Sequence, residues 1–446
     1  MHAASSRDDQ TAVIGAGVAG LAAAGRIAAA DIPVTVVEAR GRVGGRIETV
    51  RLLGWPVPIE AGAEFIHGRP QETWAAVRAA NLAVYEVSEN HWDASCVPPR
   101  SMRFDQLWTT ISERMRKLSQ DLSFASFLER DCSDLSADER DQAIAYVEGF
   151  NAADSRLVSC RWLVESEASE EQNGGEQSFR LAGGYDRLVE WLLHGIGREH
   201  AELRLSTVVN AIRWRPGEVE VAVASAAGMP LEPIRAARAI ITLPWGVLRA
   251  PQGSPGAVRF IPDLSNKWKA AESLRMGSVV KLVLRFRRAF WEDTGKDSGS
   301  GLAGFLHSPH ATFPTWWTTD PVRTAVLTAW AGGPAAERLS GLDGRALAAE
   351  AVDSLARMLA VPTSRVASLL DAWHVTDWLH DPFSRGAYSY VAVGDVAAPH
   401  RLADAVEDTL FFAGEATDER QEGTVAGALA SGYRAADEVC RAAGLT

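Results

Sequence analysis

The chain has 446 residues, of which 47% are hydrophobic and 23% are charged, which is the composition of a globular protein rather than a disordered or fibrous one. This length predicts two domains with a large buried interior. Lysine and arginine number 45 against 57 aspartates and glutamates. The resulting net charge of −12 argues against a nucleic-acid partner, and it suits a cationic ligand as well as plain solubility.

The cysteines and the first residues of the chain indicate the cellular compartment. The four cysteines lack the spacing of a disulfide framework or a zinc site, so we expect no metal. The first ten residues lack the basic and apolar regions of a signal peptide, and no apolar stretch is long enough to span a bilayer. We therefore expect a cytoplasmic protein with no membrane partner. The sequence does not indicate the oligomeric state.

The first predicted elements are a strand, a glycine turn, a helix and a second strand, at residues 11–14, 15–20, 21–30 and 33–37. Gly15 and Gly17 permit a tight turn and a close approach of a pyrophosphate to the backbone, and Gly20 lets the helix pack closely on the strand. The second strand ends at Glu38, which has the spacing of a carboxylate that accepts hydrogen bonds from a ribose. The pattern predicts a dinucleotide site but does not separate NAD from FAD.

The loop after this carboxylate favours the longer dinucleotide. A glycine pair that ends at Gly45 lies among three arginines, namely Arg40, Arg42 and Arg46. Such a loop can wrap around an extended cofactor.

The rest of the chain predicts a mixture of helices and strands. Apolar residues at helical spacing predict an amphipathic helix over 104–122. Strands are predicted at 201–212, 219–223, 239–243, 279–286, 313–318 and 324–330, and a helix at 344–359. Near the end, a strand at 410–413 runs into a turn at Gly414 and Glu415, and a second helix begins at about Gly423.

A lysine stands inside the apolar strand predicted at 279–286. Alternation places Lys281 on one face with Val279, Val283 and Arg285. This mixed face leaves two interpretations open: a solvated lysine on a half-exposed strand, or a lysine held in the interior.

Several segments together resemble the flavin-containing amine oxidase family, which includes monoamine oxidases, polyamine oxidases and lysine-specific histone demethylases. Besides the glycine motif, they are GAEFIHG at 62–68, SVVK at 278–281, DPFSRGAYSY at 381–390, and LFFAGEAT with QEGTVAGALASGYRAA at 410–436. Their order and separation span nearly the whole chain, which makes coincidence an implausible explanation.

The resemblance implies an α/β fold with two domains. One is a Rossmann-like FAD-binding domain, discontinuous in sequence, and the other is an α+β substrate domain with a mixed sheet flanked by helices. We expect the FAD-binding domain at 8–82, 181–257 and 391–446, and the substrate-binding domain at 83–180 and 258–390.

The resemblance also implies an activity, namely that of an FAD-dependent amine oxidase. A hydride passes from the carbon next to the amine nitrogen to flavin N5, and reoxidation by O2 gives hydrogen peroxide. We expect the substrate to be a polyamine, a secondary amine or another larger amine. The implied FAD-binding residues are Gly15, Gly17, Gly20, Glu38, Arg40, Gly45, Arg46, Glu64, Val209, Trp378, Gly414, Glu415, Thr424 and Val425.

Four residues are implied in catalysis. Lys281 matches a lysine that lies beside flavin N5 and is bridged to it by a water, and Tyr388 matches an aromatic wall of the substrate site. Thr424 stands at the second wall, where it resembles the histone demethylases rather than the monoamine oxidases. His67 matches a histidine near the substrate in animal polyamine oxidases, although a buried structural histidine is the simpler interpretation. Ala387 stands where covalently flavinylated relatives carry cysteine, so we expect noncovalent FAD.

Other functions remain open at this stage. An L-amino-acid oxidase would need an arginine for the substrate carboxylate, for which Arg385 is a conceivable position. A related flavoprotein desaturase or dehydrogenase shares the motifs, and a flavin-bearing interaction module is a further alternative. Four aromatic residues suggest an aromatic-lined cavity, namely Trp316, Trp317, Trp378 and Phe383.

Overall fold

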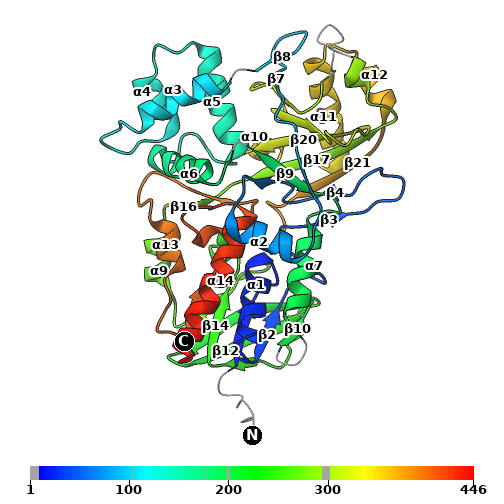
Figure 1. Cartoon of the computed structure of the whole chain (residues 1–446). Helices are drawn as coiled ribbons and strands as arrows, with labels where there is room; N and C mark the ends of the chain where they lie inside the picture. Colours follow the sequence, from blue (N-terminus) through cyan, green and yellow to red (C-terminus); the bar gives the residue numbers. More distant parts are fainter. Residues whose placement is uncertain (1–9, 103, 176, 198–200, 294–301, 446) are drawn as a thin grey trace.

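The computed structural model describes residues 10–102, 104–175, 177–197, 201–293 and 302–445. Residues 8 and 9, where the expected FAD-binding domain begins, lie outside the described residues. Within the described ranges, a five-stranded parallel sheet in the order β10-β2-β1-β14-β23 forms the lower part of the molecule in Figure 1. Its strands are β1 (Thr11–Ile14), β2 (Val34–Val37), β10 (Ala201–Arg204), β14 (Arg238–Ile241) and β23 (Leu410–Phe412). Three distant parts of the sequence thus meet in one sheet.

Helices cover one face of this parallel sheet. They are α1 (Val18–Ala28), α7 (Asp186–Gly195) and α14 (Val425–Ala442). Val13 and Ile240 point toward these helices, whereas Ile14 and Ile241 point to the opposite face. Both faces are therefore buried, which explains why the strands are continuous apolar runs rather than alternating patterns.

A four-stranded sheet covers the opposite face, in the order β13-β12-β11-β15. Its strands are β11 (Thr207–Arg215), β12 (Glu218–Ser225), β13 (Ile234–Ala236) and β15 (Arg259–Ile261). The helices, the parallel sheet and the smaller sheet make three layers.

A seven-stranded mixed sheet occupies the upper part of the molecule (Figure 1), with the order β21-β17-β20-β19-β18-β7-β8 among the described residues. Its strands are β7 (His91–Asp93), β8 (Arg100–Ser101), β17 (Val279–Phe286), β18 (Phe305–His307), β19 (Thr315–Thr318), β20 (Val326–Gly332) and β21 (Leu370–Asp377). Helices α10 (Pro334–Leu339), α11 (Gly344–Met358) and α12 (Thr363–Leu369) pack with this sheet around a second apolar core.

A group of helices lies beside the seven-stranded sheet and has its own core. It consists of α3 (Phe104–Met115), α4 (Phe124–Asp131), α5 (Ala137–Phe150) and α6 (Cys160–Gln172). The single helix expected over 104–122 is therefore wrong in length, because α3 ends at Met115. The Asp121 side chain accepts hydrogen bonds from the Ser159 hydroxyl and the Arg161 backbone NH, which ties the loop to the start of α6 instead of continuing the helix.

Shorter elements connect these layers. The two- and three-stranded sheets pair β3 (Thr49–Val50) with β4 (Ile59–Glu60), β16 (Leu274–Met276) with β22 (Ser389–Val391), and β9 (Ser178–Leu181) with β5 (Ile66–His67) and β6 (Val84–Glu86). The remaining helices are α2 (Gln71–Ala79), α8 (Trp245–Leu248), α9 (Ser265–Ala270) and α13 (Ala398–Ala403), with 3-10 turns at Phe290–Asp293 and Glu415–Thr417. Among the described helices, none is both long enough and apolar enough to cross a membrane.

Most predicted strands agree with the structure to within two residues, and β17 agrees at both ends. The solvated interpretation of its lysine is wrong, because all but one residue of β17 are buried. Apolar residues under α11 cover one face of β17, while Val283 on the other face packs with Ile59 and Val326. A lysine in this strand must therefore find its partners in the interior.

Candidate active site

A cavity of about 1090 Å³ runs from the glycine turn after β1 to the helical group. Gly15, Gly17 and Glu38 line one end, whereas Tyr146 and Glu170 line the other. The cavity is at the upper limit of the roughly 300–1,000 Å³ that small-molecule sites span. It can therefore hold an extended ligand with a second, smaller molecule beside it.

The glycine turn forms the floor of the first end. Gly15 has a φ of +109°, which a side chain would strain. A Cβ on Gly20 would lie 2.0 Å from the Gly15 carbonyl oxygen, so helix α1 can follow the turn only with glycine there. A Cβ on Gly17 would meet only the Gly45 Cα, at 4.0 Å, and would project into the cavity. Gly20 itself does not line the cavity and acts on packing alone.

Glu38 and Arg40 shape the wall above this turn. The buried Glu38 carboxylate accepts hydrogen bonds from the backbone NH groups of Ala16 and Arg40, each at 2.9 Å. The Arg40 guanidinium donates to Asp381 and to Ser384, 341 and 344 residues further along the chain. The acid that follows β2 therefore fixes the glycine turn and the arginine loop in one arrangement.

Arg46 and Glu415 join the first and last motifs. Arg46 donates to the Ala387 carbonyl at 2.8 Å and to Glu415 at 2.9 Å. The other Glu415 oxygen accepts from the Ser389 hydroxyl at 2.6 Å and from the Gly423 NH at 3.2 Å. These contacts hold the start of α14 against the cavity.

The N-terminus of α14 opens into the cavity. Thr424 is its N-cap, because its hydroxyl accepts from the Gly427 NH at 3.0 Å and donates to the Gln421 carbonyl at 2.7 Å. Val425 is the first helical residue and also lines the cavity. Gly414, with a φ of +130°, lies beside it. The free NH groups and the dipole of this helix end favour negative charge in the cavity.

Two further predicted residues line the wall of the cavity. Trp378 is buried and donates through its indole NH to the Ala61 carbonyl at 3.1 Å. Val209 of β11 lies near the glycine end. Both therefore lie where an extended ligand would pass.

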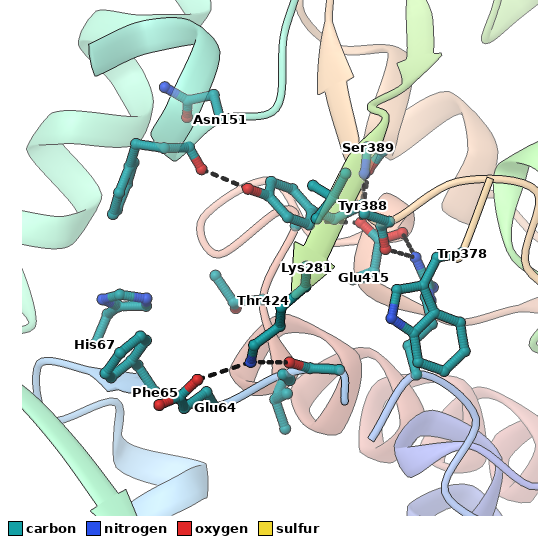
Figure 2. A pocket seen from close by; sticks show the side chains of 18 of the residues that line it. Glu64, Phe65, His67, Asn151, Lys281, Trp378, Tyr388, Ser389, Glu415 and Thr424 are labelled. Carbon is teal, nitrogen blue, oxygen red and sulfur yellow. Dashed lines mark hydrogen bonds and ion pairs between the residues drawn. The ribbon is translucent and has the colours of Figure 1, made fainter. Parts of the chain in front are cut away.

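Lys281 is held inside the molecule by a carboxylate. Its side chain is 2% exposed, and its ammonium donates to Glu64 at 2.7 Å and to the Gly62 carbonyl at 3.1 Å (Figure 2). Arg180 and the Trp317 indole donate to the same Glu64 carboxylate. Burial by itself would raise the pKa of Glu64, but Lys281 and Arg180 outweigh burial and lower its pKa to about 2. Glu64 therefore serves these cations as a permanent anion.

Tyr388 and Thr424 lie on the same side of the cavity, with His67 across from them (Figure 2). The Tyr388 hydroxyl donates to the Phe150 carbonyl at 2.6 Å, and burial raises the pKa of this phenol. The His67 ring contacts Ser178 at 3.4 Å and packs edge-on against Phe150, and burial lowers its pKa. His67 is thus a neutral ring in an aromatic setting, and the hydrogen-bond partner found for it among the described residues is the Ser178 side chain rather than the backbone.

The expectation for Trp316 is wrong, and Arg385, the conceivable position for a substrate-binding arginine, also lies elsewhere. Trp316 is fully buried in the core of the seven-stranded sheet and does not line the cavity, although Trp317, Trp378 and Phe383 do. Arg385 also lies outside the cavity lining and donates to the Pro255 carbonyl. Alternation within a strand explains the error, because Trp316 and Trp317 must point to opposite faces.

Several residues of the site were not predicted from the sequence. Arg180, which binds Glu64 but does not itself line the cavity, stands in the fully buried strand β9, and an arginine in a short apolar strand carries the same signal that singled out Lys281. Gln142, Ala145, Tyr146 and Gly149 line the cavity from one face of α5, but their helical spacing looks the same as that of core residues. Glu422, which contacts Trp162 at 2.8 Å, shows no local signal. In the described residues, no group of three or more His, Cys, Asp or Glu could hold a metal ion.

The chain is similar to known proteins over most of its length. Residues 18–440 match the family model described as flavin containing amine oxidoreductase. Two proteins of Oryza sativa subsp. japonica are each 29% identical: lysine-specific histone demethylase 1 homolog 2, with 96% of this chain and 57% of the relative covered, and polyamine oxidase 3, with 96% and 88% covered. The chain thus spans little more than half of the demethylase.

The comparison with solved structures concerns the fold. Cyclohexylamine oxidase from Brevibacterium oxydans IH-35A has a TM-score of 0.79 at 21% identity, with 98% of this chain and 100% of that chain covered. This likeness confirms the expected α/β fold class with its large mixed sheet.

Proposed function

The chain belongs to the flavin containing amine oxidoreductase family, and on this basis we propose that it is an FAD-dependent amine oxidase acting on a polyamine, a secondary amine or another larger amine. The observation that carries the proposal is the continuous cavity, which joins the glycine turn and the start of α14 to a chamber bounded by Lys281, Tyr388 and His67. A dinucleotide site alone would not need that chamber.

The residues at the glycine end fit FAD. A Cβ on Gly17 would fill the part of the cavity next to the glycine turn, so glycine leaves room there for a ligand. The starts of α1 and α14 both present NH groups to the cavity. In this proposal Gly15, Gly17 and Gly45 approach the pyrophosphate, while Glu38 and Val209 lie at the adenosine end. The remaining holders are Arg40, Arg46, Glu64, Trp378, Gly414, Glu415, Thr424 and Val425.

When bound, FAD supplies the hydride acceptor and the route by which electrons reach oxygen to give hydrogen peroxide. The protein then has to position the amine, exclude water and keep the amine neutral, because an ammonium ion does not donate a hydride. Tyr388 and His67 bound the space where the amine would lie. Lys281, fixed by Glu64, would hold a water near the reacting atoms.

The shape of the chamber favours larger amines. Thr424 carries no ring, so it leaves more of the chamber open than a second aromatic wall at this position would. The cavity continues past Tyr388 along Phe150, Tyr146 and α6. A polyamine oxidase among the relatives agrees with a long substrate.

Among the described residues of the cavity lining, no lysine or arginine is free to bind the carboxylate that the amino-acid oxidase alternative requires. The lysine and arginines that line the cavity each already bind a carboxylate, with Lys281 on Glu64, Arg46 on Glu415 and Arg40 on Asp381. A substrate carboxylate would therefore have to displace an internal ion pair, which costs several kcal/mol.

The test is a peroxide-coupled screen of the purified yellow protein against polyamines, aromatic monoamines, N-methylated amines and L-amino acids. We expect turnover with polyamines or other larger amines. Turnover confined to L-amino acids would overturn the proposal. Flavin reduction by a substrate with little peroxide in air would favour the desaturase or dehydrogenase alternative.

A further inference from the structure

Helix α6 presents one polar face to the far end of the cavity. Trp162, Ser166 and Glu170 follow each other at intervals of four residues, so they share a face of the helix, and all three line the cavity. Figure 1 shows α6 between the other helices of its group and the lower part of the molecule. The face therefore borders the chamber proposed for the amine.

Glu422 adds a carboxylate to this face from another part of the chain. Its Oε2 accepts a hydrogen bond from the Trp162 indole NH at 2.8 Å. Its Oε1 is buried and has no hydrogen-bond partner among the described residues. The Ser389 hydroxyl lies close enough to lower the pKa of Glu422, but its one proton goes to Glu415 at 2.6 Å. A buried oxygen without a donor is costly, so this oxygen calls for a ligand.

Glu170 is a second carboxylate without a counter-charge. No hydrogen bond to its side chain occurs in the described part of the chain, and Glu167 is the one charged group that acts on it. Burial, with a further contribution from Glu167, raises the pKa of Glu170 to about 7. Burial and then the Glu415 charge also raise the pKa of Glu422. By contrast, Glu167 is paired with Arg116 at 2.8 Å.

The two carboxylates are separated along the helix. Glu422 binds Trp162, and Glu170 lies eight residues further along α6, which corresponds to about 12 Å of helix. Glu422 is also the nearer of the two to the chamber. Its neighbour Gly423 lies against the Tyr388 ring, because a Cβ on Gly423 would be 3.3 Å from the Tyr388 Cδ2 atom. A ligand that reaches both would enter beside Tyr388 and extend along α6.

We propose that Glu422 and Glu170 form an acidic track along α6 that binds the distal ammonium groups of a linear polyamine, while the nitrogen to be oxidised lies beside Tyr388. The track rests on the proposed amine oxidase function and deepens it. Each ammonium supplies the donors and the positive charge that the carboxylate lacks. The methylene segments between the charges lie against Trp162, whose ring also accommodates a cation.

The experiment uses the holoenzyme and α,ω-diaminoalkanes of increasing length. Each diamine is compared with the n-alkylamine of equal length, which lacks the second amino group. Glu422→Gln and Glu170→Gln remove one charge each with little change in shape. Glu165→Gln is the matched control, since Glu165 lies on the exposed side of the same helix and does not line the cavity. The kinetic readout is kcat and KM for each amine, and the second readout is the melting temperature with the same amines in oxygen-free buffer.

We expect the preference in kcat/KM for a diamine over its monoamine to fall about ten-fold or more in Glu422→Gln, mainly through KM, because a charge-assisted hydrogen bond is lost. Glu170→Gln should have this effect only on the longer diamines, which reach the far carboxylate. Glu165→Gln should behave like the wild type. Diamine-specific stabilisation should follow the same pattern in the melting temperatures.

An equal loss for diamines and monoamines, or no change in either variant, would overturn the track. A shifted flavin absorption spectrum in Glu422→Gln with an unchanged diamine preference would also overturn it, because Glu422 would then serve the cofactor. If the wild type oxidises no amine, the proposed function fails. The melting temperatures then still decide whether diamines bind through these carboxylates.

Discussion

Lys281 shares Glu64 with Arg180, so one buried carboxylate carries two cations. This arrangement fixes the lysine ammonium in the chamber through Glu64 and the Gly62 carbonyl. We propose a role for Lys281 in the reaction. A substitution of Lys281 can test this role apart from its structural role, because Arg180 still pairs with Glu64 when the lysine is removed.

We predict that Lys281→Met slows flavin reduction or reoxidation by about ten-fold or more, as expected for a group that positions a proton or a water. Stopped-flow measurement of the two half-reactions checks this. Lys267→Met is the control, because Lys267 is also buried but donates to the Arg401 carbonyl away from the cavity. Wild-type rates in both half-reactions of Lys281→Met would remove this lysine from the mechanism.

At the scale of elements, the contact between α1 and α14 decides where both helix starts lie. A Cβ on Gly432 would come within 2.4 Å of the Ala19 carbonyl oxygen. Helix propensity favours alanine over glycine by about 1 kcal/mol, whereas overpacking costs about 1–3 kcal/mol. The close approach of the two helices should therefore outweigh propensity.

We predict that Gly432→Ala lowers the free energy of unfolding by up to about 2 kcal/mol after the propensity gain is subtracted, and that it also lowers the affinity for FAD. Urea unfolding and flavin titration measure the two effects. Gly195→Ala, at the end of α7, meets nothing within 4 Å and should be neutral or slightly stabilising. A Gly432→Ala variant as stable as Gly195→Ala would show that the helices are not in such close contact.

At the scale of the whole molecule, the cavity lies between the parallel sheet and the seven-stranded sheet and takes its lining from both. A ligand that fills it binds only the folded chain and therefore stabilises it. Ala387 offers no sulfur for a bond to the flavin. Cofactor binding should therefore contribute to stability reversibly.

We predict that acid or heat denaturation releases the yellow colour into the filtrate, and that FAD-free protein melts several degrees lower than the holoenzyme. The reason is mass action: FAD binds only the folded chain, which contributes about 2.7 kcal/mol to stability when the free FAD concentration is 100 times the dissociation constant. Adding FAD back should restore the melting temperature. Colour that stays with the precipitated polypeptide would contradict noncovalent binding.

Some properties of the molecule remain predictions from sequence. The domain boundaries, the cytoplasmic location and the use of O2 are of this kind, as are the roles of the site residues. The placement of those residues is a separate matter, and the structure brings all of them except Gly20 to the cavity wall.

The sequence by itself determined the local features: the glycine turn at Gly15, the strand around Lys281, and the start of the last helix near Gly423. Each follows from backbone preferences and periodicity within a few residues. Only the tertiary structure decided that Lys281 meets Glu64 across 217 positions, and that Glu422 meets Trp162 across 260. Such pairs depend on how whole layers pack, because burial removes water as the alternative partner and leaves each charge to whichever distant group the fold brings near.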